Sequence, residues 1–524
     1  MARLPGIAAL ALLVAIVGAA LLGLVAAADR GGSAVPWPYL RGVLAFTLVQ
    51  AALSTLVSLL LGGALALALA RRRFPGRALF IAVLNLATVL PAIVAVFGIV
   101  AAYGRSGWFG SAGEAIGLPV GRHLYGLSGI LIAHVFFNAP LAARVFLAAL
   151  AATPGEHWRL AAHLGMRPGA VFRLIDWPIL RREAPGIAGL IFLLCATSFA
   201  VVLALGGGPG AATLEVAIYE AVQFEADFGR AALLAFLQVG LSVVLIGPLL
   251  LFAARPAEAG SFGTVLPRPD AAHPATRAAD TAVLAVAALL VVPPVAATVV
   301  AGVLRLETLA DAAVLRATLT SFAIALPAGA LAVLLALAIA AASRSLRQTG
   351  HHHGATLFGA SGTLVLAVPP IALSAGLFVA LRPLADPFAL ALPLIVTVNA
   401  LMALPFALRQ VEPPLAVSAE RYGRLADSLG IAGTARLRIV DWPLLGGPLR
   451  TGFVVAVALS LGDLGVAAFF GSGTILTLPL LLSQRLGAYR TDDAASLALL
   501  LAVLVLGLLA LAGRPPGAIL ARDR

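Results

Sequence analysis

The chain has 524 residues, of which 61% are apolar and 11% charged, with a mean hydropathy of +1.04 and a formal net charge of +12. This composition excludes an ordinary soluble globular protein. Because apolar runs of 18 or more residues recur, it predicts an all-α integral membrane protein. All 35 basic residues are arginine, which excludes a lysine-dependent nucleotide-binding loop and Schiff-base chemistry.

About twelve segments are long and apolar enough to span a membrane as helices. They divide into two six-helix halves, residues 1–254 and 279–524, which are joined by a cytoplasmic linker at 255–278 rich in proline and charge. The predicted spans lie near 7–27, 43–69, 80–103, 127–150, 184–205, 230–253, 279–302, 316–342, 361–381, 391–411, 449–470 and 494–512.

Arginine is concentrated in alternate loops between these spans. The clusters occupy 71–77, 159–182, 255–277, 344–347, 421–450 and 514–524. Under the positive-inside rule, these loops and both chain termini are expected to face the cytoplasm of a bacterial inner membrane. The spread of arginine over membrane-flanking loops makes nucleic-acid binding a poor explanation of the net charge.

A segment that lies between the fourth and fifth predicted spans of the first half is repeated at the same place in the second half. Gly165 and Pro178 return as Gly430 and Pro443, an offset of 265 residues, and both copies contain Asp-Trp-Pro. Each copy predicts a short helix, a left-handed glycine that ends it, and a second apolar-faced helix that the proline ends or kinks. A duplicated helix–turn–helix of this kind is typical of a docking element for a partner. The alternative is an amphipathic segment lying on the bilayer surface.

The repeated spacing Ala-x3-Gly-x9-Ile-x2-Pro resembles the EAA loop of bacterial ABC importer permeases. The resemblance implies a type I ABC importer permease fold, with both loops inserted into a separate ATPase subunit dimer. The family's glutamate is replaced by Arg159 and Arg424, and Glu156 and Glu420 lie close enough to substitute. The other matching residues are Ala161, Gly165, Ile175 and Pro178, then Ala426, Gly430, Val440 and Pro443.

Further stretches are similar to the fused permeases of thiamine importers, among them 71–77, 94–99, 103–108, 133–138, 205–209, 462–465 and 487–490. This resemblance implies ATP-driven import of thiamine and its phosphates by alternating access. It also implies a periplasmic thiamine-binding protein as partner, no catalytic residues, and no cofactor or metal in this chain. The alternatives are a fused ABC permease for ferric iron or polyamines and, from another class, a secondary transporter.

Five polar residues at predicted membrane depth are candidates for the substrate pathway or its gate. Asp463 is the strongest candidate, because placing an ionisable group inside a membrane span costs free energy and such groups are often functional. Its counterpart at the 265-residue offset is Ser198, and the others are His134, Asn138 and Asn399. The alternative for each is a hydrogen bond that holds two spans together.

Overall fold

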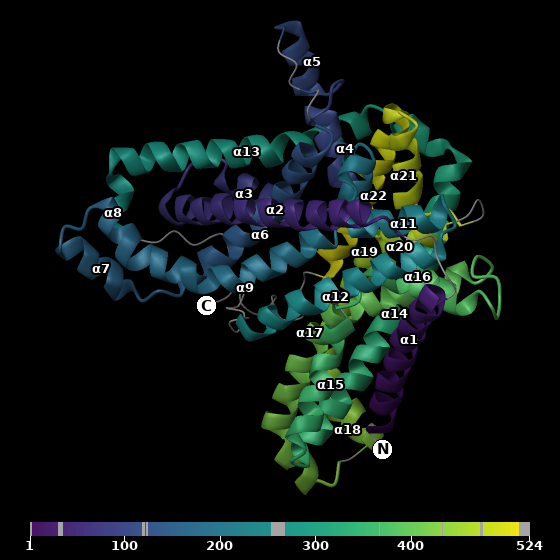
Figure 1. Cartoon of the computed structure of the whole chain (residues 1–524). Helices are drawn as coiled ribbons and strands as arrows, with labels where there is room; N and C mark the ends of the chain where they lie inside the picture. Colours follow the sequence, from purple (N-terminus) through teal and green to yellow (C-terminus); the bar gives the residue numbers. More distant parts are fainter. Residues whose placement is uncertain are drawn as a thin grey trace. The chain divides into compact units, whose positions relative to one another are not determined.

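The computed structural model describes residues 3–29, 35–117, 121, 124–252, 268–365, 367–431, 433–471 and 475–512. These residues are mainly helical, and ten of their helices are long and apolar enough to cross a membrane (Figure 1). The predicted all-α membrane fold is confirmed. Most of the predicted linker, 255–267, and the arginine cluster at 514–524 lie outside the described residues.

The helices form two compact units. The α2 unit comprises Pro36–Val216 and Leu241–Leu304. Within it, α2 packs along α6 and α9, and α13 packs against α2, α3 and α4. Its elements are α2 (Trp37–Arg71), α3 (Arg77–Ala87), α4 (Ala92–Tyr103), α5 (Trp108–Ala115), α6 (Leu127–Ala151), α7 (Gly155–His163), α8 (Pro168–Val171), the π-helical turn η2 (Phe172–Asp176), α9 (Trp177–Ala196), α10 (Ala200–Leu205), and the 3-10 turns η3 (Pro209–Ala211) and η4 (Pro269–Ala272), with α13 (Pro274–Val303).

The α14 unit comprises Met1–Val35, Ala217–Gly240 and Arg305–Arg524. Here α14 packs against α17 and α19, and α1 packs against α14 and α16. Its elements are α1 (Arg3–Asp29), η5 (Leu306–Ala310), α14 (Ala312–Gln348), α15 (His352–Val365), α16 (Pro370–Leu381), α17 (Ala391–Ser428), α18 (Gly433–Arg436), the π-helical turn η6 (Leu437–Asp441), α19 (Trp442–Leu461), α20 (Gly465–Phe470), α21 (Leu478–Gly487) and α22 (Thr491–Ala512). Parts of α11 (Leu214–Gln223) and α12 (Phe228–Phe252) belong to each unit.

The compact units do not follow the division of the sequence into halves. The first helix, α1, belongs to the unit that contains most of the second half. The helix that opens the second half, α13, belongs to the unit built mainly from the first. The division into repeats at 1–254 and 279–524 therefore stays a prediction about the sequence.

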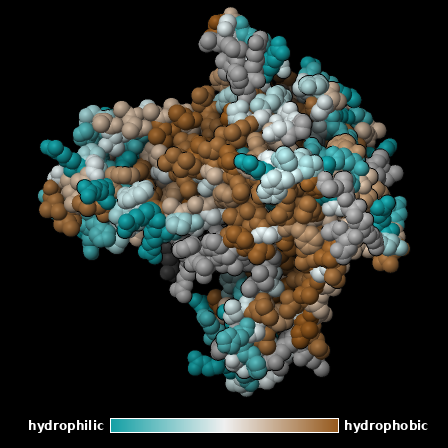
Figure 2. Space-filling view, in the orientation of Figure 1, coloured by the Kyte–Doolittle hydropathy of each residue, from teal (hydrophilic) through white to brown (hydrophobic). Residues whose placement is uncertain are grey.

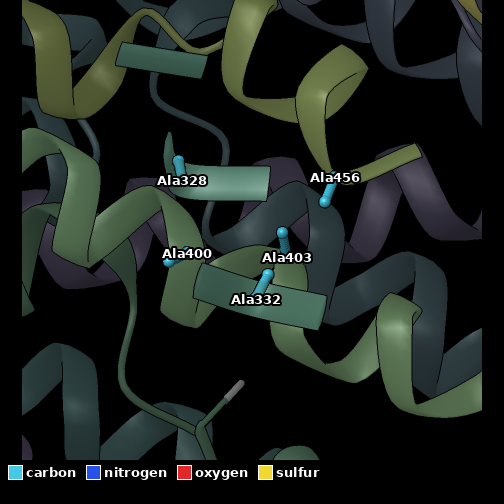
Figure 3. Close-up of a cluster of buried hydrophobic side chains, with 5 residues drawn as sticks. All are labelled: Ala328, Ala332, Ala400, Ala403 and Ala456. Atoms are coloured by element: carbon cyan, nitrogen blue, oxygen red, sulfur yellow. The ribbon is translucent and has the colours of Figure 1, made fainter. Parts of the chain in front are cut away.

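Small residues let the helices of the α14 unit approach closely. Figure 3 shows alanines from α14, α17 and α19 gathered in one buried cluster, Ala328, Ala332, Ala400, Ala403 and Ala456. At the contact of α1 with α16, a Cβ added to Gly376 would lie 2.5 Å from the carbonyl oxygen of Ala20. Because lipid tails supply no hydrophobic drive between helices, such close backbone contact is how membrane helices gain packing energy.

Four of the expected spans are split into shorter helices. The span near 361–381 is divided into α15 and α16 at Val368-Pro369, the span near 184–205 into α9 and α10 at Thr197–Phe199, the span near 80–103 into α3 and α4, and the span near 449–470 into α19 and α20. Proline explains the first break, since it lacks an N–H and restricts the residue before it. In Figure 2 the middle of α2 and α13 is hydrophobic, and hydrophilic side chains gather around α7 and α8.

Candidate partner-binding loops

We call residues 154–178 the first loop and residues 419–443 the second loop. In the first loop, α7 ends at His163, and the turn that follows it contains Gly165, which has a φ of +58°. The N–H of Met166 then donates to the carbonyl of Ala161 at 3.0 Å. This six-residue closure is a Schellman motif, which favours glycine because other residues are strained at positive φ. The predicted helix and its left-handed glycine are confirmed here.

The second loop repeats the same closure. Gly430 has a φ of +66°, and the N–H of Ile431 donates to the carbonyl of Ala426 at 2.8 Å. The spacing of alanine and glycine in the repeated motif therefore has a structural cause. The buried alanine supplies the carbonyl, and the glycine four residues later turns the chain back so that the next N–H can reach that carbonyl.

The helix before this turn differs between the loops. In the first loop it is the separate helix α7, which follows Thr153-Pro154. In the second loop it is the end of the 38-residue helix α17, so the expected boundary near residue 411 is wrong. The residue in the place of Pro154 is Ala419, which neither lacks an N–H nor restricts its predecessor, and the helix continues.

A π-helical turn follows in both loops. The N–H of Trp177 bonds the carbonyl of Phe172, five residues earlier, and the N–H of Trp442 bonds that of Leu437 in the same way. Pro178 and Pro443 come next and supply no N–H, which favours this widened turn. The helix continues through Pro178 into α9, so of the two predicted effects of the proline, an end or a kink of the helix, the end is wrong.

The π turn directs one aspartate inward in each loop. Asp176 and Asp441 are both fully buried. Asp176 accepts two hydrogen bonds from the guanidinium of Arg268, at 2.8 and 2.7 Å. Asp441 accepts one from Arg344 at 2.8 Å and one from the Ser418 hydroxyl at 2.6 Å. Each loop is thus fastened through the acid of its Asp-Trp-Pro sequence.

Asp270 also bonds Arg268, the arginine that holds Asp176. Burial raises the pKa of Asp270, but hydrogen bonds and charge from Arg268, followed by the charge of Arg71, lower it more, and the net pKa lies below the ordinary 3.8. Asp270 is therefore ionised at neutral pH and pairs with both arginines.

The inner side of the first loop is a small apolar core. Trp158, Ala161 and Val171 are buried together, and Met166 and Ile175 pack against them. Ile175 of the motif thus helps to hold the two short helices of the loop together. Its counterpart Val440 is half-buried in the second loop.

The outer side presents apolar side chains in the same register in both loops. Leu164 is 62% exposed and its counterpart Leu429 is 64% exposed. The other pairs at the 265-residue offset are likewise exposed, Leu160 with Leu425, Leu174 with Ile439, and Trp177 with Trp442. The predicted coupling residues Glu156, Arg159, Pro178, Glu420, Arg424 and Pro443 are exposed as well. We call the four exposed apolar residues of each loop its apolar face.

Sequence reasoning predicted an apolar face on the second short helix of each loop but missed the exposed leucines of the first helix. The signal was present, because Leu160 and Leu164 lie four residues apart and therefore on one side of α7. Leu160 and Leu174 also border a hollow of about 810 Å³ in the first loop, together with His157, Met166 and Pro178. An apolar face next to a hollow is suited to receiving side chains of another protein.

The pathway candidates divide into two groups. His134 shares a hydrogen bond with Ser54 at 3.0 Å, Asn138 donates to the sulfur of Cys195 at 3.4 Å, and Asn399 donates to Ser460 at 2.8 Å. Those three residues join neighbouring helices within their own units. The remaining two, Ser198 and Asp463, lie at the breaks between α9 and α10 and between α19 and α20.

Asp463 also supports the helix that follows it. Its carboxylate accepts a hydrogen bond from the N–H of Ala467 at 3.3 Å, in the first turn of α20. This is the capping arrangement that satisfies an open helix start. A role of Asp463 in the pathway stays a prediction.

Curated relatives resemble the chain over almost its whole length. The thiamine transport system permease protein ThiP of Brucella abortus (strain 2308) is 45% identical over 513 residues, which cover 97% of this chain and 94% of the relative. The protein of the same name from Escherichia coli (strain K12) is 42% identical, over 98% and 96% respectively. The sulfate transport system permease protein CysW of Synechocystis sp. (strain ATCC 27184 / PCC 6803 / Kazusa) is 30% identical over 38% of this chain and 73% of its own. No family model matches the chain.

Proposed function

Because the chain belongs to the family of thiamine transport system permease proteins, we propose that it is the membrane subunit of an ABC importer that moves thiamine and its phosphates into the cytoplasm. The support is 42–45% identity over almost the entire chain to relatives that carry this name. The chain is a non-catalytic subunit, so the energy comes from elsewhere.

The partner that supplies the energy is a separate ATPase dimer, and the two loops are its docking sites. The duplicated apolar faces support this proposal, because a dimer offers two equivalent surfaces to two equivalent elements. The chain contains no lysine, so a phosphate-binding loop of the usual kind must be on another polypeptide. The arginines around each apolar face form the polar rim expected at an interface between proteins.

The orientation follows from the same arginines. With both loops in the cytoplasm of a bacterial inner membrane, both termini face the cytoplasm as well. The opposite side then receives a periplasmic thiamine-binding protein. ATP-driven closure of the dimer brings the two loops together and opens the pathway outward, because the partner contacts the two states of the permease differently.

The test is uptake of labelled thiamine into sealed proteoliposomes that contain this chain. Uptake is expected only when the ATPase subunit, the binding protein and ATP are all present, and unlabelled thiamine should compete. Uptake without the ATPase would show a secondary transporter. Competition by ferric iron or a polyamine, but not by thiamine, would show that the substrate is wrong while the ABC mechanism stands.

A further inference from the structure

The two loops differ in how their buried aspartates are bonded to the rest of their units. Arg268, in the segment before α13, has a fully buried side chain that lies between two groups of the first loop. Its guanidinium carbon is 4.3 Å from the centre of the Trp158 ring, and its two terminal nitrogens bond both oxygens of Asp176. Its Nε and Nη2 also bond Asp270 at 3.0 Å. Arg268 thus stacks the planar face of its guanidinium on Trp158 and at the same time forms a bidentate pair with Asp176.

The same cluster reaches two membrane helices. Arg71, the last residue of α2, bonds Asp270 at 2.9 Å and Asp280 of α13 at 3.1 Å. Arg72 bonds the other oxygen of Asp280 at 2.6 Å. Together with Arg268, these arginines balance three aspartates, so the buried charges are paired. We call these six residues the clamp, Arg71, Arg72, Asp176, Arg268, Asp270 and Asp280.

The second loop is built differently at the equivalent positions. The residue in the place of Trp158 is Gly423, which offers no ring for a cation to stack on. The residue in the place of Val171 is Arg436, whose guanidinium lies 3.8 Å from where a Cβ of Gly423 would be. Arg436 pairs with Asp427 at 3.4 Å rather than with the buried aspartate.

The buried aspartate of the second loop is also less fully bonded. Asp441 Oδ2 accepts no hydrogen bond from any residue in the described part of the chain, whereas both oxygens of Asp176 are bonded to Arg268. The second loop is held to α14 through Arg344 and to its own helix through Ser418. A buried carboxylate with one unpaired oxygen is a weaker attachment than one held bidentately.

We propose that Arg268 is a positioning residue that fastens the first loop, and not the second, to α2 and α13, so that the two loops transmit the movement of their partners unequally. The proposal rests on the proposed function, in which both loops receive ATPase subunits. Movement of the first loop is passed directly to the ends of α2 and α13. The second loop begins as the end of α17 and passes its movement to that helix, without a clamp to two others.

The local part of the proposal is tested without any partner. A spin label is attached to the first loop in His163→Cys and, separately, to the second loop in Ser428→Cys, two exposed positions at the 265-residue offset. The native Cys195 is buried and is therefore protected from the label. In the full chain in lipid nanodiscs, both labels are expected to be ordered, the first by the clamp and the second because Ser428 is the last residue of α17. Arg268→Ala should free the label on the first loop and leave the second unchanged.

Matched variants distinguish loss of the clamp from a general disturbance of the fold. Arg277→Ala removes an exposed arginine near the start of α13 and should alter neither label. Arg268→Lys keeps the charge but loses the bidentate edge, so it should free the label partly. No change of the first label with Arg268→Ala, or an equal change of both labels, would overturn the proposal whatever the chain transports.

The functional part uses the complete importer in proteoliposomes. Arg268→Ala should lower the thiamine imported per ATP hydrolysed by on the order of tenfold, within the range typical of coupling between sites. ATP hydrolysis itself should continue, because the catalytic residues belong to the partner. If both activities fall together while the label stays ordered, the clamp does not position the loop. If wild-type vesicles import no thiamine, the proposed function fails and the label experiment still decides the clamp.

Discussion

Replacing the turn glycines by valine is expected to uncouple ATP hydrolysis from transport. A Cβ added at Gly165 or Gly430 meets no atom within 4 Å, so space is available and the cost lies in the backbone alone. A β-branched residue at a φ near +60° costs about 2 kcal/mol. At 1.4 kcal/mol per factor of ten, the native turn becomes about 30-fold less populated. The bond that closes the Schellman motif is lost with it.

The controls are two glycines, one in the first loop and one just after the second, that have ordinary helical φ. Gly169 in α8 and Gly446 in α19 also have open space around them, so valine is tolerated there. Uptake and ATPase activity are measured in proteoliposomes, and the amount of inserted protein is measured in membranes. Gly165→Val should lose uptake per ATP, Gly165→Asn should keep more because asparagine tolerates this conformation, and Gly169→Val should resemble the wild type. Equal coupling in Gly165→Val and Gly169→Val would refute the reasoning.

Three further outcomes are expected. Leu164→Asp and Leu429→Asp place a charge on the apolar faces, so affinity for the ATPase, measured by surface plasmon resonance, should fall about tenfold or more while the midpoint of thermal unfolding is unchanged. The pKa of Asp270 is lowered on folding, so its stabilisation of the clamp is complete above pH 3.8 and is lost only as the pH falls through its lower folded pKa; a spin label on the first loop that loosened at pH 5 would contradict this. Gly376→Leu should lower the unfolding midpoint in detergent by the equivalent of about 1–3 kcal/mol, because α1 must move away from α16, whereas Gly507→Leu on an open surface should have little effect.

The local geometry of the loops was accessible from the sequence. The glycine that ends each helix and the alanine four residues before it are coupled by a closure that spans only six residues. Local propensity decides such features, so a repeated spacing is enough to place them. The same reasoning failed at the start of the second loop, where tertiary packing carried α17 through Pro413 and Pro414 without a break.

The clamp could not be predicted from spacing. Arg268 and Asp176 are 92 residues apart, and the arginine lies in a segment that reads as a flexible connector rich in proline and charge. Only the fold shows that this connector returns to the first loop. The apolar faces are an intermediate case. Their i, i+4 leucines are visible in the sequence, but their exposure depends on the fold, which buries the side of α7 that carries Trp158 and Ala161.

The candidates for the substrate pathway also differ in whether they are bonded to a neighbouring helix. His134 and Asn399 occupy equivalent positions in the two halves, and each is engaged with a neighbouring helix. Polar groups used in this way hold spans together and are poorly placed to bind a passing cation. Ser198 and Asp463 lie instead where a helix is interrupted. Interrupted helices are where transporters expose backbone and side-chain groups to substrate, so these two breaks are the stronger candidates for contact with thiamine.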